Sequence, residues 1–490
     1  MTSVPESYPV LEQLLHMFDM SRKKYLIVPA SLCAFVLAFS EFMLVALSSP
    51  PVGQAEEQIA QPQRVVGREP IVLKHKDKVV GASLSKDEQR LLTWSNDGTA
   101  HLWRASDGAP IGHPMKHRRG ILGAVYSPDE NQVLTWSYDG SARLWRASDG
   151  QPLGQPMKHQ KPVEGAAFSP DGNRVLTWSA DGTARLWQAS DGAPISQPLK
   201  HQNRIESAAF SVDGQRALSW DRNGKAQLWR TSDGMPIGQP MRHQSRLWGA
   251  EFSRDGQQVL TWGVGLTAQL WQASDGRAIG QTMRPHGHLW GARFSNNGQR
   301  VLTWCSDGPA QVWHAVDGTS IGVPMKHDGG ISSAIFNPDD QQVLTWSGQL
   351  ARLWTSEGTP MGPPMESQHQ FWQARFSGDG QYVLTWSGEG TAQLWRASDA
   401  TPIGQPMTHD ALIEAATFSG DEKMVLTWSE DGTARLWRTS DAAPIGEPMR
   451  HQREVWGASF SRNGQRVLTW SFDGTARLWN VQVSNPTSGN

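Results

Sequence analysis

Residues 451–479 read HQREVWGASFSRNGQRVLTWSFDGTARLW and contain three short apolar segments separated by turn residues. The segments are EVWGASF, QRVLTWS and TARLW, and RNG and FDG between them are turn sequences. Earlier in the chain, residues 146–158 (RASDGQPLGQPMK) continue the pattern with one more turn and a fourth segment. None of the segments holds a helical period long enough to form a helix. The unit therefore predicts four consecutive antiparallel strands.

This unit is repeated ten times. The tripeptide LTW, once LSW, ends at tryptophans spaced 42 residues apart, with one spacing of 40. They are Trp94, Trp136, Trp178, Trp220, Trp262, Trp304, Trp346, Trp386, Trp428 and Trp470. A second tryptophan follows nine residues later, or eight in the seventh copy, so the two series account for 20 of the 24 tryptophans. Internal repeats of this length are typical of propellers and solenoids.

The fourth segment of the repeat carries prolines, such as Pro152 and Pro156. Proline cannot donate a hydrogen bond to a neighbouring strand, so this strand is expected at the outer edge of its sheet. Four antiparallel strands with a protected edge describe the blade of a β-propeller. We therefore predict an all-β fold, a β-propeller of four-stranded antiparallel blades over residues 69–482, forming one ten-bladed ring. Propellers usually have about 4–8 blades, so a split or intermolecularly completed ring stays open as the alternative.

The two ends of the repeat region complement one another. Residues 69–74 (EPIVLK) match the fourth-strand position, whereas the last repeat ends after its third strand at Trp479. The first segment is therefore expected to supply the outer strand of the last blade, which closes the ring and removes an open edge.

Four residues of each repeat carry a resemblance to the WD-repeat family of β-propellers. In the second copy they are His117 before the first strand, Thr135 in the second, Asp139 in the tight turn and Trp145 in the third. The resemblance implies that these side chains form a hydrogen-bonded structural tetrad. Such a buried polar chain is tolerable when every member is satisfied. The chain departs from the family at the final Trp-Asp dipeptide, where it has WR, WQ, WH, WT or WN.

The N-terminal region lies outside the repeats. Residues 25–48 are apolar apart from Glu41, and at about 1.5 Å per residue they are long enough to cross the ~30 Å hydrocarbon core. Arg22, Lys23 and Lys24 precede them, which predicts a single-pass membrane protein with a cytoplasmic N-terminal tail (1–24) and an extracytoplasmic propeller. A cleaved signal peptide is the alternative. Residues 49–68 are predicted to be a linker and 483–490 a C-terminal tail.

Composition and motifs argue against several functions. Acidic and basic residues nearly cancel, 47 against 45, so we expect no nucleic-acid partner. Two cysteines cannot build a disulfide framework or a cysteine-based zinc site. The repeated His and Asp recur with the frame, whereas a catalytic constellation is singular, and no catalytic or metal motif is present. We therefore expect no enzyme activity, no metal and no cofactor.

One position varies strongly between copies, five residues after the repeat histidine. It holds Val80, Leu122, Glu164, Glu206, Trp248, Trp290, Ser332, Trp372, Glu414 and Trp456. The resemblance places it at the mouth of a central channel, with Arg246 and His288 in a neighbouring position. Exposed tryptophans suit binding, and the alternative is that they fill space between blades.

The His and Asp-Gly positions of the repeat are replaced in several of the repeats that carry these tryptophans. Asp-Gly is replaced by Gly265-Leu266 in repeat 5 and lost in repeat 7, and the histidine is replaced by Pro285 in repeat 6. Repeat 8 has Ser367 and Glu389 in the His and Asp positions. A local rule broken beside added aromatic surface is a pattern expected at functional sites, although drift also explains the erosion. We predict a non-catalytic scaffold for a protein or peptide partner, with a receptor for a glycan or small ligand as the alternative.

Overall fold

The computed structural model describes residues 63–66, 69–243, 245–264 and 266–484. They belong to one compact unit, Pro62–Asn490, and the other unit is Met1–Gln61. The predicted N-terminal tail and transmembrane helix (1–24 and 25–48) therefore lie outside the described residues. Within the described part, no helix has the length and apolar character needed to cross a membrane.

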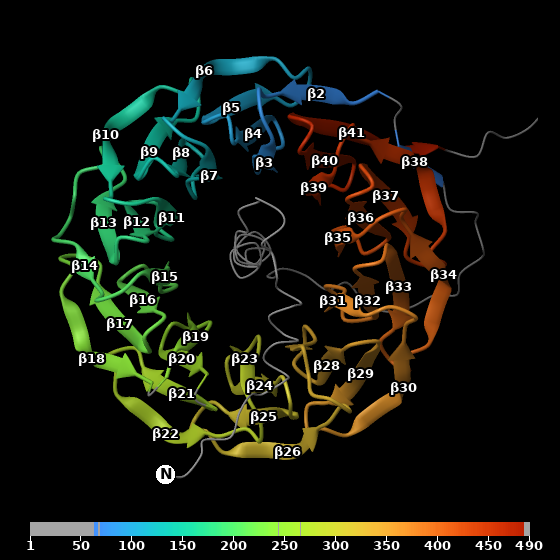
Figure 1. The fold of residues 1–490 in the computed structure, drawn as a ribbon. Helices are drawn as coiled ribbons and strands as arrows, with labels where there is room; N and C mark the ends of the chain where they lie inside the picture. The colour runs from blue at the N-terminus through green and yellow to red at the C-terminus, as the bar shows by residue number, and fades with distance from the viewer. Residues whose placement is uncertain (1–62, 67–68, 244, 265, 485–490) are drawn as a thin grey trace, which may run out of the picture. The chain divides into compact units, whose positions relative to one another are not determined.

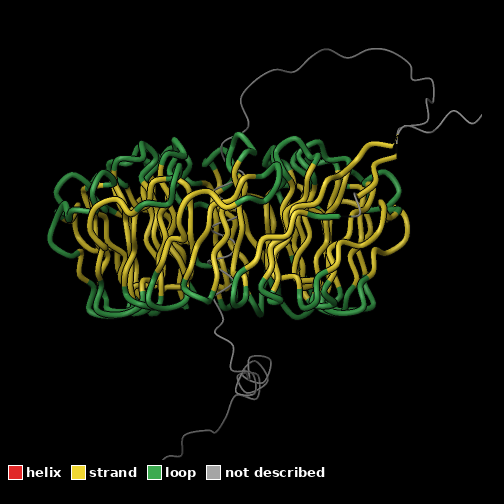
Figure 2. The backbone as a smooth tube through the Cα atoms, turned by 90° about the horizontal axis from the view of Figure 1, so that it is seen from above, coloured by secondary structure: helices red, strands yellow, loops and turns green. Residues whose placement is uncertain are grey.

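The described residues form ten antiparallel sheets arranged as the blades of one ring (Figure 1). Strands run between the two faces of the ring, where the loops gather (Figure 2). The innermost strands of blades 1 to 10 are β3 (Val79–Leu84), β7 (Ile121–Tyr126), β11 (Val163–Phe168), β15 (Ile205–Phe210), β19 (Leu247–Phe252), β23 (Leu289–Phe294), β27 (Ser333–Phe336), β31 (Phe371–Phe376), β35 (Ile413–Phe418) and β39 (Val455–Phe460). The all-β propeller with one ten-bladed ring is thus confirmed.

Three further strands complete each blade toward the outside of the ring. The second strands are β4 (Arg90–Ser95), β8 (Gln132–Ser137), β12 (Arg174–Ser179), β16 (Arg216–Asp221), β20 (Gln258–Gly263), β24 (Arg300–Cys305), β28 (Gln342–Ser347), β32 (Tyr382–Ser387), β36 (Met424–Ser429) and β40 (Arg466–Ser471). The third strands are β5 (Thr99–Arg104), β9 (Ser141–Arg146), β13 (Thr183–Gln188), β17 (Lys225–Arg230), β21 (Thr267–Gln272), β25 (Ala310–His314), β29 (Leu350–Thr355), β33 (Thr391–Arg396), β37 (Thr433–Arg438) and β41 (Thr475–Ser484). The outer strands are β6 (Pro110–Lys116), β10 (Pro152–Lys158), β14 (Leu199–Lys200), β18 (Pro236–Arg242), β22 (Ala278–Met283), β26 (Ser320–Met325), β30 (Pro360–Glu366), β34 (Pro402–Thr408), β38 (Pro444–Arg450) and, in blade 10, β2 (Ile71–Lys74).

The hydrophobic core lies between neighbouring blades. Between blades 2 and 3, for example, Leu134 and Trp136 of one blade pack in a cluster with Val163 and Trp187 of the next. The LTW tryptophan also lies across the innermost strand of its own blade: a Cβ on Gly123 would come within 2.0 Å of the Trp136 ring. A glycine at this place therefore makes room for the indole.

The ring closes as the sequence predicts, with one addition. Strand β2 pairs with β41 in the register Ile71↔Leu478 to Lys74↔Thr475. A further strand, β1 (Gln63–Val66), pairs with the extension of β41 up to Ser484. Residues 63–66, within the predicted linker 49–68, thus form a strand, and β41 extends two residues beyond the predicted propeller end at 482. This strand pair is not part of the 42-residue repeat.

Side chains also join the last blade to the first. Arg466 of β40 lies 3.2 Å (Nη2 to Oε2) from Glu88 in the turn after β3, and the Asn463 backbone N–H donates to Glu88 Oε1 at 3.0 Å. The hydrophobic cluster at this junction combines Leu468 with Val79. The seam is thus packed in the same way as the other blade junctions.

Candidate binding site at the inner rim

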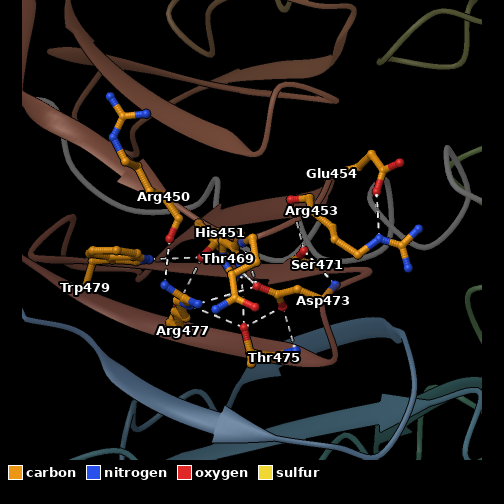
Figure 3. A network of polar contacts seen from close by, with 11 residues as sticks. Arg450, His451, Arg453, Glu454, Thr469, Ser471, Asp473, Thr475, Arg477 and Trp479 are labelled. Carbon is orange, nitrogen blue, oxygen red and sulfur yellow. Dashed lines mark hydrogen bonds and ion pairs between the residues drawn. The ribbon is translucent and has the colours of Figure 1, made fainter.

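The frame of most repeats is a hydrogen-bonded tetrad. In blade 2, Thr135 Oγ1 accepts a hydrogen bond from Trp145 Nε1 at 2.8 Å and lies 2.7 Å from His117 Nε2. His117 Nδ1 lies 3.2 Å from Asp139 Oδ2, which also accepts the Arg118 backbone N–H at 2.9 Å. Figure 3 shows the equivalent network in blade 10, where His451, Thr469, Asp473 and Trp479 take these places.

Protonation in the tetrads fits a structural role. Burial acts to raise the pKa of Asp139, but hydrogen bonds from His117 and Ser141 outweigh it and hold that pKa below its usual range. Burial lowers the pKa of His159 in blade 3 to about 4, although Asp181 beside it acts in the opposite direction. At neutral pH such a histidine is uncharged and its aspartate is ionised, so the pair is held as a fixed hydrogen bond.

Six blades have the complete tetrad: 1, 2, 3, 4, 9 and 10. Blade 4 is built differently, because Ser219 replaces the threonine and Asp221, at the end of β16, contacts His201 Nδ1 at 2.9 Å. The aspartate thus comes from two positions earlier than the tight-turn position, which is Asn223. The sequence pattern, which places the aspartate in the tight turn, therefore does not predict the Asp221–His201 contact.

Blades 5 to 8 form a contiguous arc in which the tetrad is incomplete. Blades 5 and 7 keep the His–Thr contact, His243–Thr261 and His327–Thr345, without an aspartate contact among the described residues. Blades 6 and 8 lack the histidine, and only the indole-to-threonine hydrogen bond remains. Gly265, at the aspartate position of blade 5, lies outside the described residues.

In nine of the ten blades the variable position lies at a β-bulge of the innermost strand. In blade 5, Leu247 pairs with Gly263 and Gly249 pairs with Trp262, so Trp248 is the extra residue of a β-bulge. The same shift occurs in nine of the ten blades, all except blade 7, whose strand β27 starts at Ser333. A bulge re-aims one side chain away from the sheet. We call this position, with the residue two places before it and the residue before the tight turn, the inner rim.

Exposure of the bulge residue follows the state of the tetrad. In the six blades with a complete tetrad it is half-buried: Val80, Leu122, Glu164, Glu206, Glu414 and Trp456. In blades 5, 6 and 8 it is exposed, as Trp248, Trp290 and Trp372, and Ser332 at the equivalent position of blade 7 is exposed too. The exposed fractions of the three tryptophans are 42%, 44% and 57%, so they do not act as space fillers between blades. Arc 5–8, the inner rim of blades 5 to 8, is therefore unlike the rest of the ring.

Two of the exposed tryptophans lie together. The ring centroids of Trp248 and Trp290 are 5.8 Å apart, with their planes inclined at 49°. The Arg246 guanidinium carbon lies 4.9 Å from the Trp248 ring centroid, close enough for a cation–π contact. Val264 and Leu266, in the turn that replaces the usual Asp-Gly, are 42% and 41% exposed and extend the apolar surface of blade 5. The loss of Asp-Gly from this turn was visible in the sequence. The apolar residues in its place were the signal that could have predicted an apolar surface here.

Trp456 and Trp372 are not part of this pair. Trp456 stacks on Phe472, with their ring centroids 4.8 Å apart. Lys78 Nζ lies 4.3 Å from the Phe472 ring centroid. Trp372 has no aromatic partner among the described residues, and a Cβ on Gly388 would lie 3.6 Å from its ring. Of the four predicted tryptophans, the structure thus leaves three exposed and covers one.

Charged side chains gather elsewhere on the inner rim. In blades 3 and 4, Arg204 Nη2 contacts Glu164 Oε2 at 2.8 Å, and Arg222 forms an ion pair with Glu206. In blade 9, burial and then the charges of Glu430 and Glu454 raise the pKa of Glu414 to about 7. The predicted carboxylates Glu164 and Glu206 are therefore paired, whereas Glu414 lies among like charges.

His288 and Cys305 of blade 6 lie in different environments, the first exposed and the second buried. His288 Nε2 lies 3.6 Å from Asp307 Oδ2 on the exposed rim of blade 6. Cys305 is buried, and burial together with Asp307 raises its thiol pKa to about 12. Among the described residues, no group of three or more His, Cys, Asp or Glu side chains is placed to hold a metal ion.

Comparison with known proteins agrees with this repeat structure. The family model for the WD domain, G-beta repeat, matches residues 150–188 and 444–480. Each match covers one outer strand and the first three strands of the next blade, and both next blades, 3 and 10, have complete tetrads. At least these two of the ten repeats are thus of the WD type.

Two solved structures match this chain over most of its length. The computationally designed protein Ika8 is 18% identical with a TM-score of 0.47, over 86% of this chain and 99% of its own. The C-terminal WD40 domain of Sif2 is 16% identical with a TM-score of 0.46, over 74% of this chain and 96% of its own. Among curated protein sequences, none matches the chain.

Proposed function

We propose that this chain, a β-propeller with WD-type repeats, is a membrane-anchored, non-catalytic scaffold that binds a protein or peptide partner on arc 5–8. One observation carries the proposal: the bulge residue is exposed only in the blades whose tetrad is incomplete. Tryptophan is enriched among residues that dominate binding energy, because it offers a large rigid apolar surface at low entropic cost.

Alternatives for the exposed tryptophans are weaker. Packing between blades would bury them, as it buries the Leu247 and Leu289 side chains that precede them, both 2% exposed. A glycan receptor would use the same indoles. The exposed apolar side chains Val264 and Leu266 of blade 5 favour a protein or peptide surface over a glycan.

The binding test compares two equivalent positions. The full chain is purified from detergent-solubilised membranes as wild type, Trp290→Ala and Leu122→Ala, and co-purifying proteins are quantified. Leu122 is the half-buried bulge residue of blade 2 and serves as the matched control. We expect Trp290→Ala to leave thermal stability nearly unchanged and to weaken the partner by about 2 kcal/mol or more. A loss of stability of about 3–5 kcal/mol would instead mean that Trp290 is core packing, and the proposal would fall.

The membrane anchor and orientation are part of the proposal and rest on residues 25–48 with Arg22, Lys23 and Lys24. A reporter enzyme active only outside the cytoplasm, fused after Asn490, is expected to be active. Protease added to intact cells should reach the propeller. Protection of the propeller until the membrane is broken would contradict the orientation.

A further inference from the structure

Among the described residues, one arginine of the inner rim forms no ion pair with a carboxylate. In blades 3 and 4 each arginine is matched, Arg204 with Glu164 and Arg222 with Glu206. Arg246 forms no ion pair within the described residues, and its guanidinium lies over the Trp248 ring. The inner rim of blades 3 to 5 therefore carries an excess positive charge, which is located at Arg246.

A hollow of about 510 Å³ opens beside this arginine, lined by Arg222, Asn223, Ser245 and Arg246. The Ser245 hydroxyl is buried and has no hydrogen-bond partner among the described residues. Burial and then the charge of Arg222 lower the pKa of Arg246, whereas Glu206, which pairs with Arg222, acts in the opposite direction, so a net repulsion between the two guanidinium groups remains. An anion placed between them would relieve this repulsion and give the hydroxyl an acceptor.

The surroundings of the hollow suit a peptide better than a free ion. Trp248 directly follows Leu247 and Arg246, and it contacts Trp290, so apolar surface begins where the hollow ends. Blades 9 and 10 carry Glu414, Glu430 and Glu454, whose charges act on one another. These carboxylates would repel an acidic segment from the other side of the inner rim and favour blades 4 to 6.

We infer, on the basis of the proposed function, that the partner is an acidic peptide segment. An Asp or Glu carboxylate binds in the hollow between Arg222 and Arg246, and a neighbouring apolar side chain packs on Trp248 and Trp290. Guanidinium groups bind carboxylates in a bidentate geometry. Contact with the indole face fixes Arg246 in advance and shields the ion pair from water, which strengthens it.

The test uses a randomised peptide display library as the probe. The library is panned on the full chain in nanodiscs, as wild type, Arg246→Glu, Trp290→Ala and Arg284→Glu. Arg284 is an exposed arginine outside the inner rim and controls for the change in net charge. Folding of each variant is verified by its melting curve.

We expect the wild type to enrich peptides with Asp or Glu beside an apolar residue. Arg246→Glu should shift the enrichment to Lys and Arg and weaken the best wild-type peptide at least tenfold, whereas Arg284→Glu changes neither. If peptides require Trp290 but their charge preference is the same in Arg246→Glu, this inference is overturned and the proposed function stands. If no enriched peptide depends on Trp290, both are overturned.

Discussion

The threonine of the second strand and the tryptophan at the bulge lie in opposite environments. The threonine is buried and the tryptophan is exposed. Thr135 is fully buried and bonded to both His117 and Trp145, so each of its neighbours loses a partner if it changes. Trp290 is 44% exposed, and its only aromatic partner among the described residues is Trp248. At the scale of single residues, frame and surface are therefore separable by substitution.

Asp139→Ala tests the frame. The change removes the acceptor of His117 Nδ1, the Arg118 N–H, the Ser141 N–H and the Ser141 hydroxyl, and the Asp139 side chain is only 6% exposed. We expect a loss of about 1–3 kcal/mol in the free energy of unfolding, with partner binding intact. Chemical denaturation measures it, with the exposed Asp410→Ala as the control. An equal effect of both variants would contradict a structural role for the tetrad.

Glu414→Gln tests the electrostatics of the inner rim. Burial and the neighbouring Glu430 and Glu454 raise the pKa of Glu414 from 4.5 to about 7. The folded protein thus holds a proton that the unfolded chain releases, so the carboxyl destabilises the fold progressively as pH rises from about 4.5 to 7. We expect Glu414→Gln to be more stable than wild type by about 1–3 kcal/mol at pH 8 and equal to it near pH 4.5.

Unfolding in urea at both pH values measures this difference. Glu447→Gln, an exposed change on β38, is the control and should show no such trend. If Glu414→Gln has the same effect at both pH values, the pKa of Glu414 is not raised by its surroundings.

At the scale of strands, the outer strand depends on one glycine. In β10, Gly154 has φ of +64°, and a Cβ there would lie 1.7 Å from the Asp191 carbonyl oxygen of the next blade. The following residue, Gln155, donates its N–H to that carbonyl at 3.0 Å. Blade 3 has Ser196 at the equivalent place, and its outer strand is reduced to β14, with two residues. Loss of the glycine accounts for the short strand, because serine avoids this backbone region.

Two reciprocal substitutions test this account of the outer strand. Ser196→Gly is expected to lengthen β14 and to stabilise the protein by about 0.5–1 kcal/mol, whereas Gly154→Ser should destabilise it by more than 1 kcal/mol. Melting temperatures and amide exchange of Gln197 report the two effects. Faster exchange or lower stability in Ser196→Gly would show that the serine is not the cause.

The strand pattern was predictable from the sequence because turn residues separate the strands and the second and third strands carry tryptophans that recur with the repeat. The exposure of the bulge residues was not, since alternation of apolar residues predicts which face of a sheet a residue takes and a bulge breaks that alternation. The role of Asp221 could not be predicted because it contacts His201 from a different backbone position. Strand β1 could not be predicted because its partner, the end of β41, lies beyond the last repeat.

At the scale of the whole molecule, the ring is held closed by segments from its two ends. Leu73 of β2 is fully buried in the core of the seam with Leu468 and Leu478. Deleting residues 69–74 would remove this strand and leave the Thr475–Leu478 edge of β41 without its partner. An open edge in a chain that contains nine near-copies of the missing strand favours pairing between chains.

We therefore expect the 69–74 deletion to form oligomers, measured by light scattering after size-exclusion chromatography. Removal of residues 485–490, beyond the end of β41, is the control. A deletion variant that stays monomeric and as stable as wild type would argue against closure by β2.

The partner is proposed to contact arc 5–8. The variable position occurs once in each of the ten blades, so one decisive measurement replaces it in each blade in turn with a photo-crosslinking amino acid, in the full chain in intact cells. We expect crosslinks to one partner from positions 248, 290, 332 and 372, and none from the half-buried positions 80 and 122. Equal crosslinking from all ten positions, or crosslinking confined to the blades with complete tetrads, would contradict the account.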